Sequence, residues 1–329
     1  MSITTVKSIG MTVADMERAI DFYTTIFGFT TIGDRQVTGM ETVDEISLQT
    51  ERSCEESTTI QLRVVDLQLG AETIELTEYI TPIGRPIPPD ARSNDRWFQH
   101  IAIVVSDMER AYQHLCGHQV TQTLPSPQTL PDWNPVAGGI QAFYFRDPDG
   151  HHLELIQFPT GKGDPEWQGT DSLFLGIDHT AIVVADTAAS LAFYCDLLGM
   201  KLKQQSENFG VEQDRLSGIA NVRVRISSLK APAGIGIELL EYLAPTDGRP
   251  IPIDTEFNDL WCWQTNIIVT APLDTVQQLT AAQFPLVSAE ISLASESTLE
   301  FDRQFVFQDP DRHTIRLVDR FKKATVNHY

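Results

Sequence analysis

The chain has 329 residues, 42% of them hydrophobic, and a formal net charge of −21. This length predicts about two domains of ordinary size, and the acidic surface excludes nucleic acid and anionic membranes as partners because both would be repelled. The sequence holds no apolar run long enough to span a membrane, its first residues lack the features of a secretory signal, and its four cysteines form no CxxC pair. We therefore expect a cytoplasmic protein with free thiols.

The first predicted elements are a strand, IGMTV, and a helix, MERAIDFYTTIFG. Asp15 lies between them at the position of a helix N-cap, and Gly28 lies where the helix should end. The same order of strand, aspartate and helix returns at Asp107 and at Asp186. A fourth copy, IIVTA followed by PLDTVQQL, has no aspartate at this position. The chain therefore repeats one strand–helix unit.

Three further strands are predicted after each helix, because alternating or apolar runs are interrupted there by turn residues. The last strand of each unit reads AETIELTEY, HHLELIQF, GIGIELLEY or HTIRLVDRF. Each unit is thus a βαβββ module, and the fold class is α+β. The modules, numbered 1 to 4 in chain order, cover residues 4–82, 96–159, 174–245 and 259–320.

The two halves of the chain repeat each other. GRPIP occurs at 84–88 and at 248–252, ND-x-W follows in both places, and EYITP in the first half matches EYLAP in the second. This tandem duplication predicts a first domain at 1–158 and a second domain at 174–329. The Gly- and Pro-rich segment 159–173 is the predicted linker.

The start of a module, a strand, an aspartate and a helix with FYxxxxG, and the end DPDGHHLEL at 147–155 resemble the vicinal oxygen chelate superfamily. That superfamily includes glyoxalase I, methylmalonyl-CoA epimerase, extradiol dioxygenases and bleomycin-resistance proteins. The resemblance covers all four modules, and it implies that the modules pair into two cup-shaped mixed sheets. It also implies a divalent metal ion in a cup, bound by residues from the first and last strands of each module.

The positions that the resemblance assigns to metal ligands differ between the modules. Modules 2 and 3 place histidine and glutamate there: His100, Glu154, His179 and Glu238. Modules 1 and 4 place there Ser8, Glu75, Gln264 and Arg316. An arginine offers no lone pair to a metal and brings a positive charge of its own. We therefore expect one intact metal site and one degenerate site, in which Glu75 is structural.

The pairing of the modules decides whether the four good ligands meet. Short connections usually join neighbouring elements, which favours pairing in chain order, 1 with 2 and 3 with 4, or a swapped equivalent in a dimer. That order would divide the ligands between two incomplete sites. Because only the pairing of 2 with 3 and 1 with 4 unites them in one cup of one chain, we predict this central pairing.

Imidazole and carboxylate together suit Zn, Ni, Co, Mn or Fe(II). The resemblance implies a small-molecule substrate that chelates the ion through two neighbouring oxygens, and a monomer or a homodimer. We predict a lyase or isomerase of the glyoxalase and epimerase kind, in which Glu154 or Glu238 takes a proton next to a metal-bound carbonyl. The alternatives are an Fe(II)-dependent extradiol-type dioxygenase and a non-catalytic small-molecule binding protein.

Other side chains can border the same cup. Strand alternation puts His152 on the face of Glu154, although a polar residue at the end of a turn is the plainer interpretation. Trp133 lies in a Pro- and Gly-rich loop that is either a lid or an ordinary surface loop. Arg223 and Arg225 share one strand face, where they would bind a substrate anion or, as we favour, pair with the acidic surface.

Overall fold

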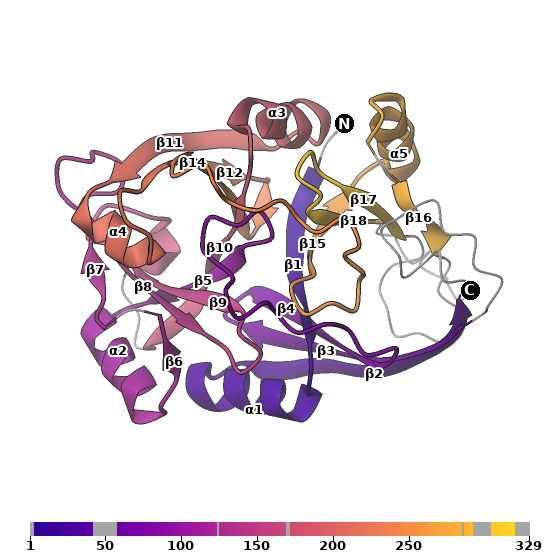
Figure 1. Ribbon diagram of the computed structural model, residues 1–329, viewed down its shortest axis with the longest axis horizontal. Helices are drawn as coiled ribbons and strands as arrows, with labels where there is room; N and C mark the ends of the chain where they lie inside the picture. Colours follow the sequence, from indigo (N-terminus) through magenta and orange to yellow (C-terminus); the bar gives the residue numbers. More distant parts are fainter. Residues whose placement is uncertain are drawn as a thin grey trace, which may run out of the picture.

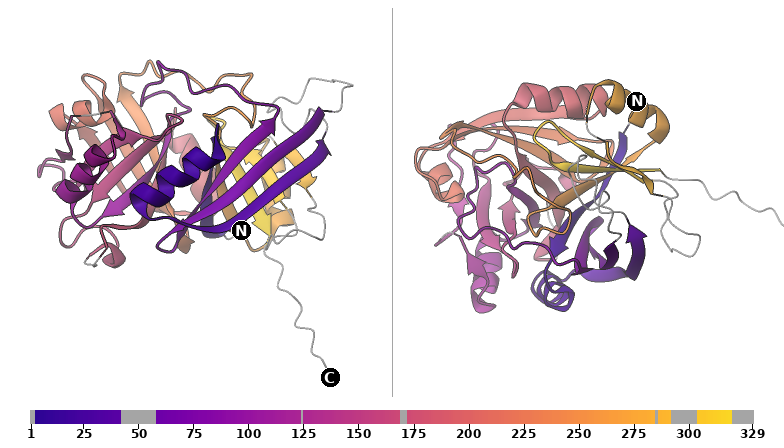
Figure 2. Two further views of the ribbon diagram at one scale, coloured as in Figure 1. Left: turned by 90° about the horizontal axis from the view of Figure 1, so that it is seen from below. Right: turned by 45° about the vertical axis from the view of Figure 1, so that its right-hand side comes forward.

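The computed structural model describes residues 3–41, 58–123, 125–168, 172–284, 286–291 and 304–319. These residues form two nine-stranded mixed sheets that lie side by side (Figures 1 and 2). One sheet, in spatial order, contains β16 (Leu286–Ile291), β17 (Gln304–Gln308), β18 (Thr314–Asp319), β15 (Trp263–Val269), β1 (Ile3–Val13), β4 (Glu72–Thr81), β3 (Thr58–Leu69) and β2 (Thr30–Glu41), with β13 (Ala233–Gly234) beside β1.

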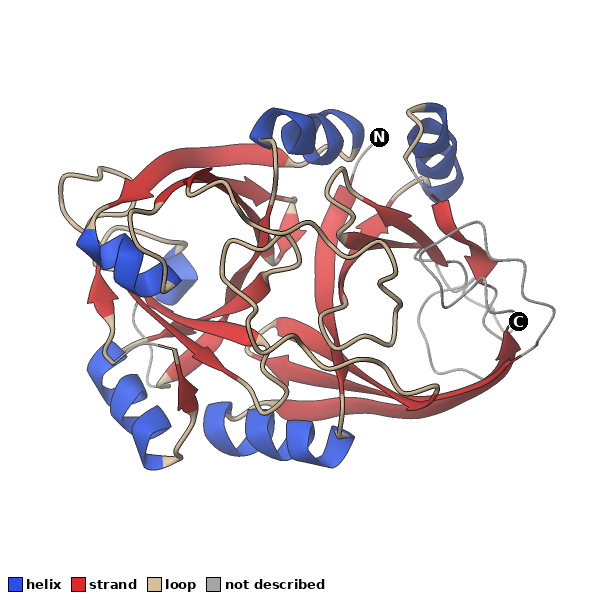
Figure 3. Ribbon diagram, in the orientation of Figure 1, coloured by secondary structure: helices blue, strands red, loops and turns tan. Residues whose placement is uncertain are grey.

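The other sheet contains β11 (Lys201–Phe209), β12 (Arg223–Lys230), β14 (Gly236–Ala244), β10 (Phe174–Val183), β5 (Gln99–Val105), β9 (His152–Gln157), β8 (Gln141–Arg146) and β6 (Thr121–Gln122), with β7 (Gln128–Thr129) beside β8. The helices lie around the outside of the strands (Figure 3). They are α1 (Met16–Phe27), α2 (Met108–Gly117), α3 (Thr187–Leu191) with a π-helical continuation (Ala192–Leu197), α4 (Val211–Ser217) and α5 (Pro272–Ala281), besides a 3₁₀ turn (Pro165–Trp167).

Local sequence signals explain where the helices begin and end. The side chain of Asp15 accepts a hydrogen bond from the backbone N–H of Arg18 at the start of α1. Gly28 ends this helix in the left-handed conformation, with φ of 77°. Asp107 and Asp186 cap α2 and α3 in the same way. The α+β prediction with repeated βαβββ modules is confirmed.

Module 2 departs from the expected pattern of three full strands after the helix. Its second strand is reduced to the two short pieces β6 and β7. Pro125 and Pro127 lie between these pieces, and a proline has no N–H for a sheet ladder. The chain then forms the loop that carries Trp133 before it enters β8.

The modules pair across the two halves of the chain. Strand β5 of module 2 runs antiparallel to β10 of module 3, and β1 of module 1 runs antiparallel to β15 of module 4. The central pairing that the ligand pattern predicted is therefore confirmed. The division of the sequence into domains at 1–158 and 174–329 stays a prediction, because strand pairing does not test whether either half folds alone.

The repeated GRPIP and ND-x-W segments hold this crossed arrangement together. Arg85 donates to Asp259 at 2.6 Å and lies over the ring of Trp261 at 4.8 Å. A β-carbon at Gly84 would lie 1.7 Å from the carbonyl oxygen of Asn258, so the close approach of the two segments requires glycine. The other copy makes the reciprocal contacts, of Arg249 with Asp95 and Trp97. Each half therefore binds the other through the same motif.

A single apolar core extends across both sheets. It contains Leu153 and Leu155 of β9, the inner face of β1 and the buried face of α1. Phe27 of α1 packs on Phe145 of β8, with ring centroids 5.7 Å apart. A smaller apolar cluster lies on the opposite face of β5 and β9, and it includes Ala102 of β5 and Leu130 of the loop after β7. This opposite face is the concave face of the central cup.

The turn of DPDGH contains a buried ion pair, and one member of the pair bonds to the segment that precedes β15 of the other sheet. His151 lies 2.8 Å from Asp147 through Nδ1 and 2.7 Å from the carbonyl oxygen of Leu260 through Nε2. Because a carbonyl and a carboxylate both accept hydrogen bonds, both ring nitrogens donate, as in an imidazolium. Burial would raise the pKa of Asp147 and lower that of His151, but their contact outweighs burial and shifts both pKa values in the opposite directions.

Replacing His151 with glutamine is expected to lower the free energy of unfolding by about 3 kcal/mol near pH 6, as when a buried ion pair is broken. The raised pKa of His151 stabilises the fold below its unfolded pKa of about 6.5, and this contribution is lost as the pH rises through the raised value. The lowered pKa of Asp147 stabilises the fold above its unfolded pKa of about 3.9, and this contribution is lost as the pH falls through the lowered value.

Urea unfolding at a series of pH values measures this dependence. The loss of unfolding free energy in the His151→Gln variant, relative to the parent protein, should become smaller as the pH rises above the raised pKa of His151. Replacement of the exposed His118 by glutamine is the control and should leave the profile unchanged. A deficit that is the same at every pH would show that the pair is not ionised.

Candidate metal centre

Four adjacent strands bring together the predicted ligands of modules 2 and 3. In the order β9, β5, β10 and β14, these strands carry Glu154, His100, His179 and Glu238. The register opposes Ala102 to both Glu154 and His179, so that these two side chains lie on either side of a residue with little bulk. Because Leu153 and Leu155 belong to the large core, Glu154 projects from the other face of β9, into the cup.

Three of the four side chains form a compact cluster. The ligand atoms of His100, Glu154 and His179 all lie within 4.8 Å of one another, and the three residues are buried. Glu154 Oε2 is 3.1 Å from His100 Nε2 and 3.5 Å from His179 Nε2. Two atoms bound to one ion at about 2.1 Å can be at most about 4.2 Å apart. Both contacts of Glu154 are within this limit, and imidazole and carboxylate donors suit a transition-metal or zinc ion.

Glu238 adjoins this cluster and is held less tightly. Its Oε2 lies 3.5 Å from His179 Nε2, and its Oε1 accepts a hydrogen bond from the hydroxyl of Ser228. The side chain of Glu238 is 19% exposed, whereas that of Glu154 is 7% exposed. Of the two carboxylates, Glu238 is thus the one with access to a molecule in the cup.

The charges in the cluster compensate one another. Burial alone would raise the pKa of Glu154, but hydrogen bonds from His100 and His179 lower it to about 2. Burial alone would lower the pKa of His179, but Glu238, Asp178 and Glu154 raise it well above its usual value. The carboxylates around His179 thus favour a positive charge at this place, which a bound cation would also supply.

A second layer of side chains orients His179. Its Nδ1 donates to Asp178 at 2.9 Å, and the other oxygen of Asp178 accepts from Trp167 Nε1 at 2.9 Å. Lys230 lies 3.5 Å from the same carboxylate. Such a carboxylate fixes the ring of a ligating histidine so that Nε2 points at the ion. His100 Nδ1, in contrast, is buried and has no partner among the residues that the structure describes.

Sequence reasoning missed the role of Asp178. Strict alternation would turn this residue away from its neighbour His179. A β-bulge between Ile177 and His179 interrupts the ladder with β5 and lets both side chains meet. Only the direct adjacency of Asp and His in the sequence hinted at the contact.

The corresponding positions of modules 1 and 4 hold an ion-pair network. Arg316 pairs with Glu75 at 2.8 Å and donates to the side-chain oxygen of Gln264. Arg35 pairs with the other oxygen of Glu75 at 2.9 Å. Burial would raise the pKa of Glu75, but Arg316 and Arg35 lower it. Ser8 accepts a hydrogen bond from Asn266. Two guanidinium groups thus neutralise Glu75, whose counterparts in the other cup are the candidate ligands Glu154 and Glu238.

The remaining sequence candidates lie around the rim of the central cup. Trp133 is half-exposed and stacks on Phe209 of β11, with centroids 4.3 Å apart. Asn134 beside it donates to Asn208 at 2.7 Å, so the loop is docked on module 3. The two arginines of β12 pair with carboxylates, as favoured from the sequence: Arg223 with Glu207, and Arg225 with Glu207 and Glu241.

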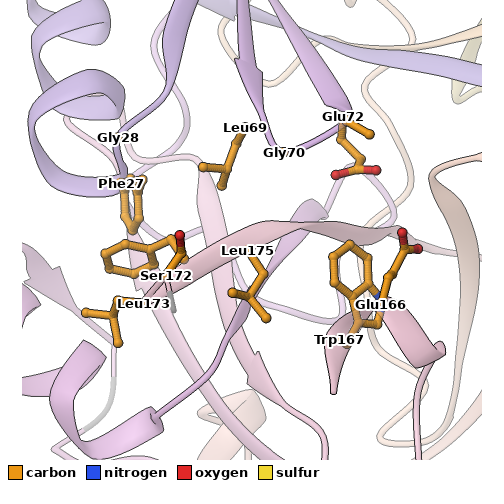
Figure 4. Close-up of a pocket in the computed structure, with 12 residues that line it drawn as sticks. Phe27, Gly28, Leu69, Gly70, Glu72, Glu166, Trp167, Ser172, Leu173 and Leu175 are labelled. Atoms are coloured by element: carbon orange, nitrogen blue, oxygen red, sulfur yellow. The ribbon is translucent and has the colours of Figure 1, made fainter. Parts of the chain in front are cut away.

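Two cavities lie near the central sheet. The larger, of about 620 Å³, has Trp167 and Glu72 at one end and Phe27 and Leu173 at the other (Figure 4), and none of the candidate ligands lines it. The smaller, of about 380 Å³, is lined by Tyr144 and His152, among others. The ring centroid of Tyr144 is 5.0 Å from that of His100, so this smaller cavity adjoins the cluster.

Comparison with known proteins gives the class of the molecule. The family model of the Glyoxalase/Bleomycin resistance protein/Dioxygenase superfamily matches residues 5–155 and 176–317. The chain belongs to this superfamily. Within the part that the structure describes, no helix is long and apolar enough to cross a membrane.

Individual relatives agree with this class. A 2-epi-5-epi-valiolone epimerase from Actinomyces sp is 32% identical over 161 residues, which are 47% of this chain and 80% of that protein. The structure of glyoxalase I from Zea mays matches with a TM-score of 0.60 and 18% identity, over 97% of this chain and 92% of that one. A proposed dioxygenase from Bacillus subtilis matches with a TM-score of 0.56 and 12% identity, over 98% and 86%. These two structures share the fold.

Proposed function

We propose that this protein is a metal-dependent epimerase, which removes and returns a proton next to a carbonyl of a small molecule. The observation that carries the proposal is the buried cluster of His100, Glu154 and His179 with the more accessible Glu238 beside it. The likeness to a curated epimerase supports this reaction over the other reactions of the superfamily.

The cluster and Glu238 are the residues that would hold the ion. Two imidazoles with carboxylates suit Zn, Ni, Co, Mn or Fe(II). When bound, the ion would polarise the carbonyl of a substrate that chelates it through neighbouring oxygens, and would stabilise the negative charge that forms as the proton leaves.

The side chains in and around the cluster have different roles in the proposed proton transfer. Glu154 is held between two histidines, which suits a fixed ligand. Glu238 is bound by Ser228 through one oxygen, and its partial exposure lets the other oxygen reach a C–H in the cup. Burial and the charge of Glu154 raise the pKa of Tyr144 well above 10, so its hydroxyl keeps its proton. Tyr144 lines the cavity and can donate a hydrogen bond to a substrate oxygen.

Two measurements on the purified full-length chain test the proposal. Elemental analysis should find about one divalent ion per chain, as expected for one intact site. In deuterated water, at least one ketone of a panel that begins with 2-epi-5-epi-valiolone should gain deuterium next to its carbonyl, and the Glu238→Gln variant should slow this exchange even when excess metal keeps its site occupied. The proposal would be refuted if the purified protein contained no metal. It would also be refuted if metal-loaded protein exchanged no proton of any ketone tested.

One observation favours a second candidate. Two histidines and one carboxylate are also the ligand set of non-haem Fe(II) oxygenases, and His100, Glu154 and His179 are the three residues that meet most closely. A dioxygenase would retain iron and consume oxygen with catechols. Exchange without oxygen uptake separates the epimerase from this alternative.

A further inference from the structure

We propose that Arg146 and His152 form a subsite for an anionic group of the substrate, a carboxylate or a phosphate, in the cavity beside the candidate metal ligands. This inference names a substrate class for the proposed epimerase and therefore rests on that function. It is carried by the position of the two side chains and by their lack of partners.

The strand register places the subsite within reach of the metal cluster. His152 of β9 is opposite His100 of β5 on one side and opposite Arg146 of β8 on the other. Tyr144, two residues before Arg146, is opposite Glu154. A molecule in the cavity of about 380 Å³ would therefore contact Arg146 and His152 at one end and approach the ligands past Tyr144.

Arg146 carries a charge that nothing in the described part of the chain neutralises. Within the described ranges its Nε is buried without a hydrogen-bond partner, and its Nη2 has a single long contact, 3.5 Å, to the carbonyl oxygen of Ala91. Arg92, which lines the same cavity, is instead paired with Asp247 at 2.9 Å. In a chain with a net charge of −21, a partly buried guanidinium without a carboxylate is unusual. Its planar fork of donors fits two oxygens of one anion.

His152 supplies a second unsatisfied group. Both ring nitrogens are buried and have no partner among the residues that the structure describes, and the ring packs on Phe98 with centroids 4.7 Å apart. Unpaired buried polar atoms cost stability, so a ligand that satisfies them would be bound favourably. Because His152 lies beside Arg146, one ring nitrogen can donate to an oxygen of the same anion.

The repeat offers an internal comparison. The turn FRDPDG of module 2 corresponds to FQDPDR of module 4, so that Gln308 takes the place of Arg146 and Thr314 takes the place of His152. The pair of Arg146 and His152 is therefore present in the cup with the candidate histidine and glutamate ligands. It is absent from the corresponding described residues of the other cup, where Arg316 pairs with Glu75. This association links the anion subsite to the reacting cup.

The test uses the full-length protein as purified, with its metal content measured. Inorganic phosphate and acetate serve as probes for the two anions, and binding is followed by isothermal titration calorimetry. We expect at least one probe to bind, and Arg146→Gln to weaken it by at least about ten-fold, as for loss of a charged hydrogen-bonding group. Arg146→Lys should bind with intermediate strength. Arg110→Gln, an exposed position on α2, should bind like the parent protein.

Each outcome decides the inference. The inference is overturned if neither probe binds to the parent protein. It is also overturned if Arg146→Gln binds as well as the parent protein, since the anion would then bind to the metal or at another place. An unchanged metal content and an unchanged circular dichroism spectrum show that the variant is folded. Anion binding does not require turnover, so a protein that binds phosphate through Arg146 but exchanges no proton defeats the proposed function and not the subsite.

Discussion

Glu154→Gln is expected to release the metal ion and to abolish proton exchange. The carboxylate lies 3.1 Å from His100 Nε2 and 3.5 Å from His179 Nε2, so it is the member of the cluster that touches both imidazoles. An amide keeps the shape of the side chain and loses the negative charge that attracts the ion. Loss of second-layer groups already costs roughly 10-fold to 100-fold in metal affinity, and we expect loss of this ligand to cost at least about 100-fold.

Elemental analysis and a chelator competition measure the metal, and deuterium exchange measures the activity. The matched control is Glu75→Gln, the corresponding position in module 1, where Arg316 and Arg35 already neutralise the carboxylate. This control should keep its metal and its exchange rate. If Glu75→Gln loses the ion and Glu154→Gln retains it, the assignment of the intact cup is wrong.

Arg316→Met is expected to destabilise the protein without affecting the metal. The guanidinium is mostly buried between Glu75 and Gln264, and its removal leaves a buried carboxylate with Arg35 as its remaining charged partner. Breaking a buried ion pair by removing one member typically costs about 3 kcal/mol or more. Urea unfolding should therefore show a lower free energy of unfolding by about this amount, while the metal content stays at the parent value.

The control for this variant is Arg223→Gln. Arg223 pairs with Glu207 at the exposed edge formed by β11 and β12, and exposed ion pairs contribute little. It should unfold like the parent protein. An Arg316→Met variant as stable as this control would mean that the network in the second cup does not support the fold, and a loss of metal would mean that the two cups are not independent.

Repetition explains why much of the site could be predicted. Because the chain contains the same module four times, a residue of one module has a known counterpart in the others. His100 and His179 occupy equivalent positions, and this equivalence marks both as candidate ligands. The same comparison singles out Arg316 as the residue that cannot bind a metal. The helix ends follow from local chemistry as well, since an aspartate cap and a left-handed glycine act within a few residues.

The contacts that local pattern could not predict depend on interruptions of that pattern. The bulge before His179 brings Asp178 to its neighbour's ring, and Trp167 of the linker then reaches the same carboxylate. The prolines of module 2 divide its second strand, and the loop that follows docks on module 3 through Trp133. Neither the bulge nor the divided strand is predicted by a periodicity in the sequence.

By itself the sequence determined the modules and their number, because these follow from strand and helix periods and from comparison of repeats. The candidate ligands followed once the resemblance to the superfamily assigned their positions and the repeats were compared there. The tertiary structure decided between the two pairings that the sequence allowed: module 2 pairs with module 3, and β5 and β10 therefore bring the two histidines to one carboxylate. It also decided which charges are neutralised. Arg316 and Arg146 are both arginines near the end of a module, yet among the described residues only the first has a carboxylate within reach. Ion pairing acts over a few ångströms in space, and separation along the chain does not report it.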